Sequence, residues 1–376
     1  MKNVIIYMII IVAFTYNYTQ VNASEPTGYM SVTGPCNLEF PKDHGPHPGY
    51  RTEWWYYTGN LHAPSGEKYG FQLTFFRRQI RPSAERQKWP QPTSAWRTQQ
   101  IYMAHSAISN MAEKQHLQAE LVARGALNMA GANLIEDTTS LTVRNWSAHI
   151  LSDRHLLEVQ TDRFRFDLVL TPEKPPVMHG VDGYSRRGST ANRASCYYSF
   201  SKLDTRGKLS IDDKIVAVKG STWMDHEYGT DMLGPGLKGW DWFALQLSDK
   251  TEIMVYLLRS KAGGIAPTSS ATVIGKKGLK RRLSKKDFEV IVLETWKSPN
   301  SHAVYPAGWR LRILPELLEL SITPNLADQE MLTTESTGTI YWEGSVSVAG
   351  SKAGKPVSGQ GYVELTGYAN PFKAPM

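Results

Sequence analysis

Hydrophobic and polar residues alternate along many short segments of the chain, and runs rich in Gly, Pro, Asn and Asp separate these segments. In the segment 164–170, every second residue from Phe164 onward is a large hydrophobic one. Alternation with this period is typical of antiparallel strands that bury one face. No long stretch shows the period of an amphipathic helix. The pattern predicts an all-β protein, with further strands at 54–61, 69–77, 141–146, 240–247, 252–259, 309–313 and 318–323.

The two halves of the chain repeat the same arrangement. The segments 53–77 and 239–259 both read as aromatic hairpins that end in arginine, and the closing segments 220–228 and 361–368 also correspond. Gly-Pro-Gly interrupts the pattern near residue 235, where we place a domain boundary. Closing an antiparallel sheet into a barrel removes its free edges and can leave room for one small apolar ligand. We therefore expect two tandem antiparallel β-barrels, residues 24–235 and 236–376.

The N-terminus has the features of a signal peptide. Lys2 precedes an apolar run at 4–14, which is too short for a bilayer span of roughly 20 residues. Val21-x-Ala23 is a small-residue cleavage pattern. We expect cleavage of residues 1–23 and export to the periplasm or the medium, with an uncleaved membrane anchor as the alternative.

Cysteine content and charge set further limits. Two cysteines, Cys36 and Cys196, exclude a disulfide-rich scaffold, and the sequence leaves open whether they pair. The formal net charge is +7, and part of it lies in a basic cluster at 276–286. Such clusters can contact nucleic acid or an anionic membrane. Because no stacking motif accompanies it, we expect a solvated loop and no nucleic acid partner, with peripheral membrane contact as the alternative.

The segment 223–228, Trp-Met-Asp-His-Glu-Tyr, carries the sharpest chemical signal. In an extended strand, Trp223, Asp225 and Glu227 point to one side, while His226 points to the other. Burial beside an indole and mutual repulsion raise a carboxyl pKa, as a general acid working near neutral pH requires. A charged strand end that is hydrogen-bonded to its neighbours is the structural alternative.

Glu53 begins the first aromatic strand, with Trp55 and Tyr57 on its own face and Trp54 on the opposite face. A carboxylate buried there needs a partner such as Arg77, because an unpaired buried charge costs several kcal/mol. The sequence leaves open whether Glu53 is a structural ion pair or a substrate contact.

His105 lies in an apolar strand and is either a core residue or a catalytic one. The repeat aligns Thr366 with Asp225 and Gly367 with His226. Because the acidic group then stands in the first copy alone, we expect the working site in the first domain.

Other signatures are missing from the sequence: a Gly-x-Ser-x-Gly elbow, a Walker loop, His-Glu-x-x-His and Cys-x-x-Cys. His44 and His47 have metal-like spacing, but they lie in a Pro-Gly loop with no obvious third ligand nearby. We predict no metal site and no cofactor.

The segments 53–61, 223–227, 239–243 and 361–368 resemble the signatures of the AttH/CrtC family. These are exported bacterial proteins that resemble carotenoid 1,2-hydratase and are often described as secreted hydrolases. The resemblance covers nearly all of the mature chain, with the motifs in the family's order. It implies two lipocalin-like domains in tandem, the CrtC-type domain first.

The resemblance also implies a hydrophobic small-molecule substrate or ligand. In a hydratase, Asp225, His226 and Glu227 match the family's acidic motif and would protonate an alkene. Aromatic faces would stabilise the carbocation through cation–π contact; the candidates are Trp54, Trp55, Trp223 and Trp242. Ester hydrolysis by activated water remains a second hypothesis, and a non-catalytic carrier of a lipid or polyene a third. An enzyme should hold Asp225 or Glu227 in an apolar cavity, whereas a carrier should leave both exposed or salt-bridged.

Overall fold

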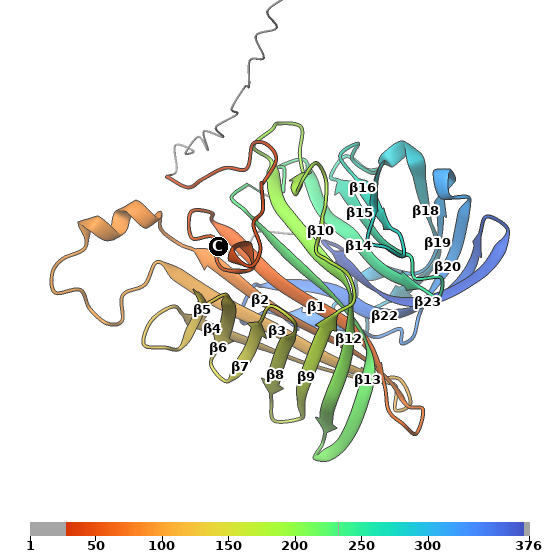
Figure 1. The fold of residues 1–376 in the computed structure, drawn as a ribbon, viewed down its shortest axis with the longest axis horizontal. Helices are drawn as coiled ribbons and strands as arrows, with labels where there is room; N and C mark the ends of the chain where they lie inside the picture. The colour runs from red at the N-terminus through yellow and green to blue at the C-terminus, as the bar shows by residue number, and fades with distance from the viewer. Residues whose placement is uncertain (1–27, 232, 372–376) are drawn as a thin grey trace, which may run out of the picture.

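The computed structural model describes residues 28–231 and 233–371, which are 60% strand and 4% helix. They form two antiparallel sheets, one of 13 strands and one of 10. Figure 1 shows the two curved sheets side by side, each built from one half of the chain. One is a nearly closed barrel and the other a half-barrel, which confirms the expected all-β, tandem-barrel fold class. The expected signal peptide, residues 1–23, lies outside the described residues.

The first sheet has the order β4-β3-β2-β1-β13-β12-β9-β8-β7-β6-β5, and β10 and β11 also pair with β12. Its strands are β1 (Thr52–His62), β2 (Lys68–Gln79), β3 (Gln100–Asn110), β4 (Gln115–Arg124), β5 (Ala130–Ile135), β6 (Thr138–Val143), β7 (Trp146–Ile150), β8 (His155–Gln160), β9 (Phe164–Pro172), β10 (Val177–Met178), β11 (Tyr184–Arg186), β12 (Ala194–Ile211) and β13 (Lys214–Gly229).

The second sheet has the order β17-β16-β15-β14-β23-β22-β20-β19-β18, and β21 also pairs with β22. Its strands are β14 (Leu237–Leu247), β15 (Glu252–Ser260), β16 (Ser270–Ile274), β17 (Lys280–Ser284), β18 (Phe288–Lys297), β19 (Val304–Ile313), β20 (Leu318–Pro324), β21 (Glu330–Thr333), β22 (Thr339–Lys352) and β23 (Lys355–Thr366). Four short 3-10 helices complete the described elements: η1 (Lys42–His44), η2 (Ser83–Lys88), η3 (Lys285–Asp287) and η4 (Leu314–Glu316).

Both sheets share one topology. In each, the first and last strands pair, β1 with β13 and β14 with β23. In each, the two edge strands are consecutive in sequence, β4 and β5 in the first and β17 and β18 in the second. The segment around residue 235, where the sequence predicts a boundary, lies between the end of β13 and the start of β14.

Matching contacts hold the halves together. Asn60 Nδ2 of the first sheet donates to the carbonyl of Gly361 at 3.0 Å. Gln246 Nε2, at the corresponding place in the second sheet, donates to the carbonyl of Thr222 at 3.1 Å. The two halves thus face each other through equivalent surfaces.

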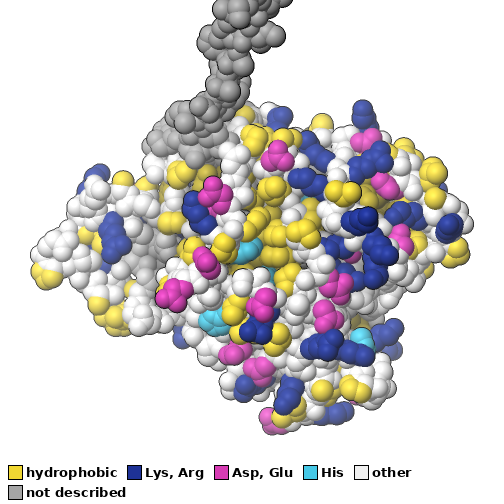
Figure 2. Space-filling view, viewed as in Figure 1, with side chains coloured by type: hydrophobic (Ala, Val, Ile, Leu, Met, Phe, Trp, Pro, Cys, Tyr) yellow, Lys and Arg dark blue, Asp and Glu magenta, His cyan; other side chains and the backbone are white. Residues whose placement is uncertain are grey.

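One local expectation is wrong, and another holds only in part. The strand expected at 141–146 is interrupted, because Arg144 takes a left-handed conformation (φ 53°) and forms a turn between β6 and β7. The basic cluster is a loop only in part: Lys276 and Lys277 lie in a turn, Lys280, Arg281 and Arg282 on the edge strand β17, and Lys285 and Lys286 in η3. Charged side chains on an edge strand hinder pairing with other chains. Lys and Arg side chains gather over the side of the second sheet in Figure 2.

Each sheet has its own apolar core on one face. Large side chains such as Trp55, Trp146 and Phe166 fill the first, and Phe243 and Trp309 belong to the second. A third cluster, which includes Tyr56, Trp223 and Trp242, joins the two sheets. Strands such as β1 are therefore buried on both faces, one toward a core and one toward the other sheet.

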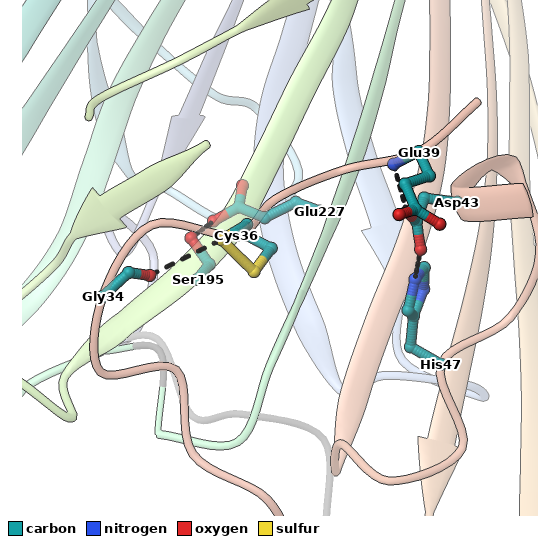
Figure 3. Close-up of a disulfide and its surroundings, with 8 residues drawn as sticks. Gly34, Cys36, Glu39, Asp43, His47, Ser195 and Glu227 are labelled. Carbon is teal, nitrogen blue, oxygen red and sulfur yellow. Dashed lines mark hydrogen bonds and ion pairs between the residues drawn. A yellow bond between two sulfur atoms is a disulfide. The ribbon is translucent and has the colours of Figure 1, made fainter. Parts of the chain in front are cut away.

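A disulfide joins Cys36 to Cys196 on β12, with the Cα atoms 5.8 Å apart and 160 positions between them in sequence. Figure 3 shows it beside Ser195, the neighbouring residue of β12, which donates a hydrogen bond to Glu227. The bond therefore ties the segment before β1 to the strand that supports the acidic residues. Within residues 28–231 and 233–371, no helix has the length and apolar character of a transmembrane span.

Candidate functional site

A cavity of about 290 Å³ lies between the two sheets. The sequence predicts a working site in the first domain, but the cavity is shared by both domains, because an apolar core and the buried residues around Glu53 occupy the interior of the first barrel. The cavity is formed instead by the opposite faces of the same strands. Aromatic side chains from both halves dominate its lining: Trp54, Tyr56, Phe76, Tyr197, Trp240, Trp242, Tyr256 and Tyr341.

Asp225 of β13 lies in the wall of this cavity. Trp223 Nε1 donates to its Oδ1 and the Tyr197 hydroxyl to its Oδ2, each at 2.6 Å, and the Ser199 hydroxyl also donates to Oδ1. Burial raises the pKa of Asp225 to about 7 in spite of these donors, and Glu227 adds to the rise. Because all three donors are neutral, the carboxyl can take up or release a proton near neutral pH.

Glu227 also faces the cavity, but its charge is compensated. Arg187 forms a buried salt bridge with Glu227, and Ser195 donates a further hydrogen bond to the same oxygen. The Arg187 guanidinium also lies 3.7 Å from the centre of the Tyr256 ring, a cation–π contact between the two sheets. Glu227 therefore serves as the partner of a fixed cation.

The second sheet adds two buried carboxyls, Glu343 of β22 and Glu364 of β23, which are cross-strand neighbours. Burial raises the pKa of Glu364 to about 7, although Trp240 Nε1 donates to it at 2.9 Å. Burial and Glu364 raise the pKa of Glu343 well above its ordinary value. The phenols of Tyr56 and Tyr341 lie close enough to oppose this rise, but neither forms a hydrogen bond of good geometry with Glu343. Its buried environment therefore favours the protonated form of Glu343.

The strand register makes Glu364 the counterpart of Asp225. Asp225 pairs with Tyr56 on β1. Glu364 pairs with Trp242, which holds the corresponding place on β14. The sequence alignment with Thr366 was wrong by two residues, a shift that preserves the face of the strand but changes the cross-strand partner. An acid is present in both copies, so the argument for a site in the first domain alone fails.

His105 of β3 borders the cavity. Its Nδ1 lies 2.9 Å from the Tyr341 hydroxyl, and its Nε2 lies 2.8 Å from the Ser336 hydroxyl. Burial lowers the pKa of His105 to about 3, so the ring is neutral. With both nitrogens engaged, His105 orients Tyr341 rather than facing a ligand directly.

His226 and Glu53 lie on the opposite faces of β13 and β1, away from Asp225. Arg77 Nε donates to Glu53 Oε2 at 2.7 Å, and His226 Nε2 lies 2.9 Å from Oε1. Burial opposes ionisation of Glu53, but Arg77 and His47 outweigh it and hold its pKa well below the ordinary value. The Trp55 ring stacks on His226 with 4.6 Å between centroids. This group is a buried charge network inside the first barrel.

The remaining aromatic candidates divide between the two faces. Trp54 and Trp242 line the cavity. Trp223 supports it through the hydrogen bond to Asp225. Tyr57 lies in the first core, where its hydroxyl is 3.1 Å from His155 Nδ1.

His47, Glu53 and His226 bring potential ligand atoms within 4.8 Å of one another. His47 Nδ1 lies 2.7 Å from Glu53, however, and Nε2 lies 2.9 Å from Asp43. Burial lowers the pKa of His47, but the two carboxylates outweigh it and leave that pKa raised. The two carboxylates thus favour the protonated imidazole, which competes with metal ligation, and Arg77 already compensates Glu53. The group fits an ion-pair network better than a cation site.

The sequence matches the family model described as AttH-like over residues 31–368. The chain belongs to the AttH-like family. A crystal structure from Nitrosomonas europaea, described as an AttH candidate, is 32% identical to this AttH-like chain, with a TM-score of 0.79, and covers 90% of this chain and 99% of that one. Kievitone hydratase from Nectria haematococca shares the fold at 17% identity, with a TM-score of 0.69 and coverage of 92% and 98%. CghA with Sch210972 shares it at 14% identity, with a TM-score of 0.52 and coverage of 90% and 96%. No curated protein matches the sequence.

Several residues of the cavity were not predicted from the sequence, among them the charged or hydrogen-bonding residues Arg187, Tyr197, Glu343 and Glu364. Arg187 follows the short strand β11, where nothing in the local pattern marks it. A signal for Glu364 existed in the closing segment of the repeat, since it lies two residues before Thr366. Only the strand register shows that it is the equivalent acid.

Proposed function

We propose that this protein is an exported enzyme that protonates a hydrophobic, unsaturated substrate in the cavity between its two sheets, and that it acts as a hydratase. The observation that carries the proposal is the environment of Asp225. This carboxyl lies in an aromatic cavity without a cationic hydrogen-bond partner, and its pKa is raised to about 7 by burial. A general acid is most effective when its pKa lies near the working pH.

Hydration of an alkene needs one acid and one base. The acid transfers its proton to one alkene carbon, and the other carbon becomes a carbocation. The faces of Trp54 and Trp242 can stabilise that charge. A water oxygen then bonds to the cation, and a carboxylate accepts the released proton. Asp225 is the proposed acid, and the carboxylate that it becomes after donating its proton can accept the proton released by water; Glu364 on the opposite wall is a second candidate acceptor.

The structural neighbours support this reaction class without fixing the substrate. Kievitone hydratase is named for a hydration reaction, and CghA was crystallised with the small molecule Sch210972. Both share this fold over nine-tenths or more of the present chain.

Ester hydrolysis through a serine nucleophile is less well supported. Ser199 Oγ lies 2.7 Å from His179 Nε2, but it donates to Asp225, and neither Ser199 nor His179 lines the cavity. Hydrolysis would therefore need activated water.

One contact favours a non-catalytic carrier. Glu227 is tied into a salt bridge with Arg187, as expected for a carrier, whereas Asp225 faces an apolar cavity, as expected for an enzyme. Turnover separates these two candidates.

Export is part of the proposal, and the Cys36–Cys196 disulfide supports it. Disulfides persist in oxidising compartments outside the cytoplasm. Edman sequencing of protein recovered from the periplasm or medium tests this point, with Ser24 as the expected first residue.

The reaction is tested by incubating the purified protein with a panel of apolar alkenes and esters in H₂¹⁸O, followed by mass spectrometry. A hydratase adds one labelled water to an alkene. A hydrolase places the label in a released carboxylate. A carrier leaves every compound unchanged while binding some of them.

A further inference from the structure

Two arginines line the cavity beside the start of β1. Arg51 immediately precedes this strand, and Arg78 of β2 pairs with Thr52. Arg78 is 5% exposed and donates to the Thr52 hydroxyl, yet its Nε has no hydrogen-bond partner. The buried Nε of Arg51 also has none, and its guanidinium lies 5.6 Å from the centre of the Tyr29 ring.

Within the described part of the chain, neither guanidinium has an acidic partner in a salt bridge. Asp231 also lines the cavity, but it pairs with Arg193 at 3.1 Å. Burial lowers the pKa of Arg78 to about 10, and the half-buried Arg51 adds to this effect, because neighbouring cations repel each other. Buried guanidinium groups without anions are rare in folded proteins, since the uncompensated charge is costly.

We propose that Arg51 and Arg78 form a subsite for an anionic group, such as a carboxylate, at one end of a hydrophobic substrate. Guanidinium groups bind carboxylates through charge-assisted hydrogen bonds that match the donors left free here. This inference rests on the proposed function, since it assigns a substrate class to the same cavity.

Strand geometry sets the distance between this subsite and the acids. Arg78 lies four residues from Thr74 along β2, which is about 13 Å at roughly 3.3 Å per residue. Thr74 pairs with Tyr56, and Tyr56 pairs with Asp225 on its other side. Asp225 lies two strands further across the sheet, another roughly 10 Å, so the backbones of Arg78 and Asp225 are about 16 Å apart. We therefore expect an elongated, amphipathic substrate whose anionic end lies far from the group that Asp225 protonates. The aromatic side chains of Trp54 and Phe76, which are cross-strand neighbours, line the cavity between the arginines and Asp225.

The test compares dodecanoate with methyl dodecanoate as competitors of the neutral dye Nile red, at pH 8 and at two salt concentrations. We expect dodecanoate to bind about 10- to 100-fold more tightly than its ester, as charge-assisted hydrogen bonds allow, and to lose part of this preference at high salt. Arg51→Gln and Arg78→Gln should each reduce dodecanoate affinity by about tenfold or more, while ester affinity stays unchanged. Arg163→Gln is the matched control, because Arg163 is exposed and pairs with Asp212 at the protein surface.

Each outcome decides the question. Equal binding of acid and ester to the wild type overturns the anionic subsite and leaves the apolar site intact. Failure of Nile red and both competitors to bind overturns the hydrophobic cavity, and with it the proposed function. A loss of acid preference in Arg163→Gln as large as in the other variants makes the effect one of net charge and also overturns the subsite. If Arg78→Gln does not fold, the half-buried Arg51→Gln and the charge-retaining Arg78→Lys give the same comparison.

Discussion

Tyr197 donates its hydroxyl proton to Asp225 at 2.6 Å, and the same oxygen accepts a hydrogen bond from Trp242 Nε1 at 3.0 Å. Tyr197 and Asp225 belong to the first sheet, whereas Trp242 belongs to the second. Trp242 of the second sheet therefore helps to position the Tyr197 hydroxyl, which donates to the proposed acid Asp225. Neither half contains a complete site.

Asp225→Asn should abolish most of any turnover, because the amide keeps the shape of the side chain but can neither carry the charge nor release the proton. The expected loss in kcat is about 10²–10⁴-fold, the usual contribution of a positioned acid or base. Binding of an apolar ligand should change little. Steady-state kinetics and Nile red displacement measure the two effects separately.

Asp204→Asn is the control for this substitution, since Asp204 lies on the neighbouring strand β12 but is surface-exposed and pairs with Arg206. If Asp225→Asn retains full activity, the acid role assigned to Asp225 is wrong. Glu343, which is buried in the same cavity and whose pKa is raised by burial and by Glu364, is then the next residue to change.

The same variant should alter the pH dependence of stability. The pKa of Asp225 is about 7 in the folded protein and about 3.9 in an unfolded chain, so between these values the folded state holds a proton that the unfolded state has released. Its contribution to stability is fully present below about pH 4 and is lost as pH rises through about 7. Asparagine does not ionise, so Asp225→Asn should gain in Tm relative to the wild type between pH 5 and pH 8.5. A Tm difference that stays constant over this range would show that Asp225 ionises normally.

Arg77→Met should destabilise the protein strongly. The substitution removes the cation nearest Glu53, and both side chains are 0% exposed. Breaking a buried ion pair from one side costs about 3–5 kcal/mol of unfolding free energy. Arg163→Met, which breaks the exposed pair with Asp212, should cost about 0–1 kcal/mol. Urea unfolding followed by tryptophan fluorescence compares the two; equal losses would mean that the Glu53 network is not a stabilising element.

Removal of the disulfide should lower stability and disturb the acidic residues together. Cys36→Ser with Cys196→Ser opens a loop of 160 positions, and native disulfides typically contribute about 2–4 kcal/mol. Cys196 lies between Ser195 and Tyr197, which donate to Glu227 and Asp225. We therefore expect reduced ligand affinity along with a lower urea midpoint. A drop in stability with unchanged affinity would limit the disulfide to a purely structural role.

The strands could be predicted because a period of two is a local property. The turn at Arg144 was missed because both flanking segments, 141–143 and 146–150, carry the same alternation. The location of the cavity was missed for a related reason. Trp54, Trp55, Tyr56 and Tyr57 are aromatic on both faces of β1, so the pattern cannot say which face meets the core and which meets the other sheet.

Part of the site also follows from alternation. Asp225 and Glu227 share one face of β13 and His226 takes the other, as the extended strand requires. Arg187 and Glu343 lie far away in sequence, and they meet these acids only because two sheets pack together. The disulfide likewise depends on a distance that no spacing in the sequence fixes.

The hydrogen bonds donated by the side-chain amides of Asn60 and Gln246 show that the two halves are related by an approximate twofold symmetry. Each runs from one half to the same backbone position of the other, as in the self-complementary interface of a twofold-symmetric dimer. The two walls of the cavity are therefore related by an approximate twofold axis, and a ligand would meet the same surface in either orientation wherever the walls match. Ser199 and Glu343, which lie beside Asp225 and Glu364 respectively, occupy equivalent positions but differ, and this difference gives the shared pocket a direction.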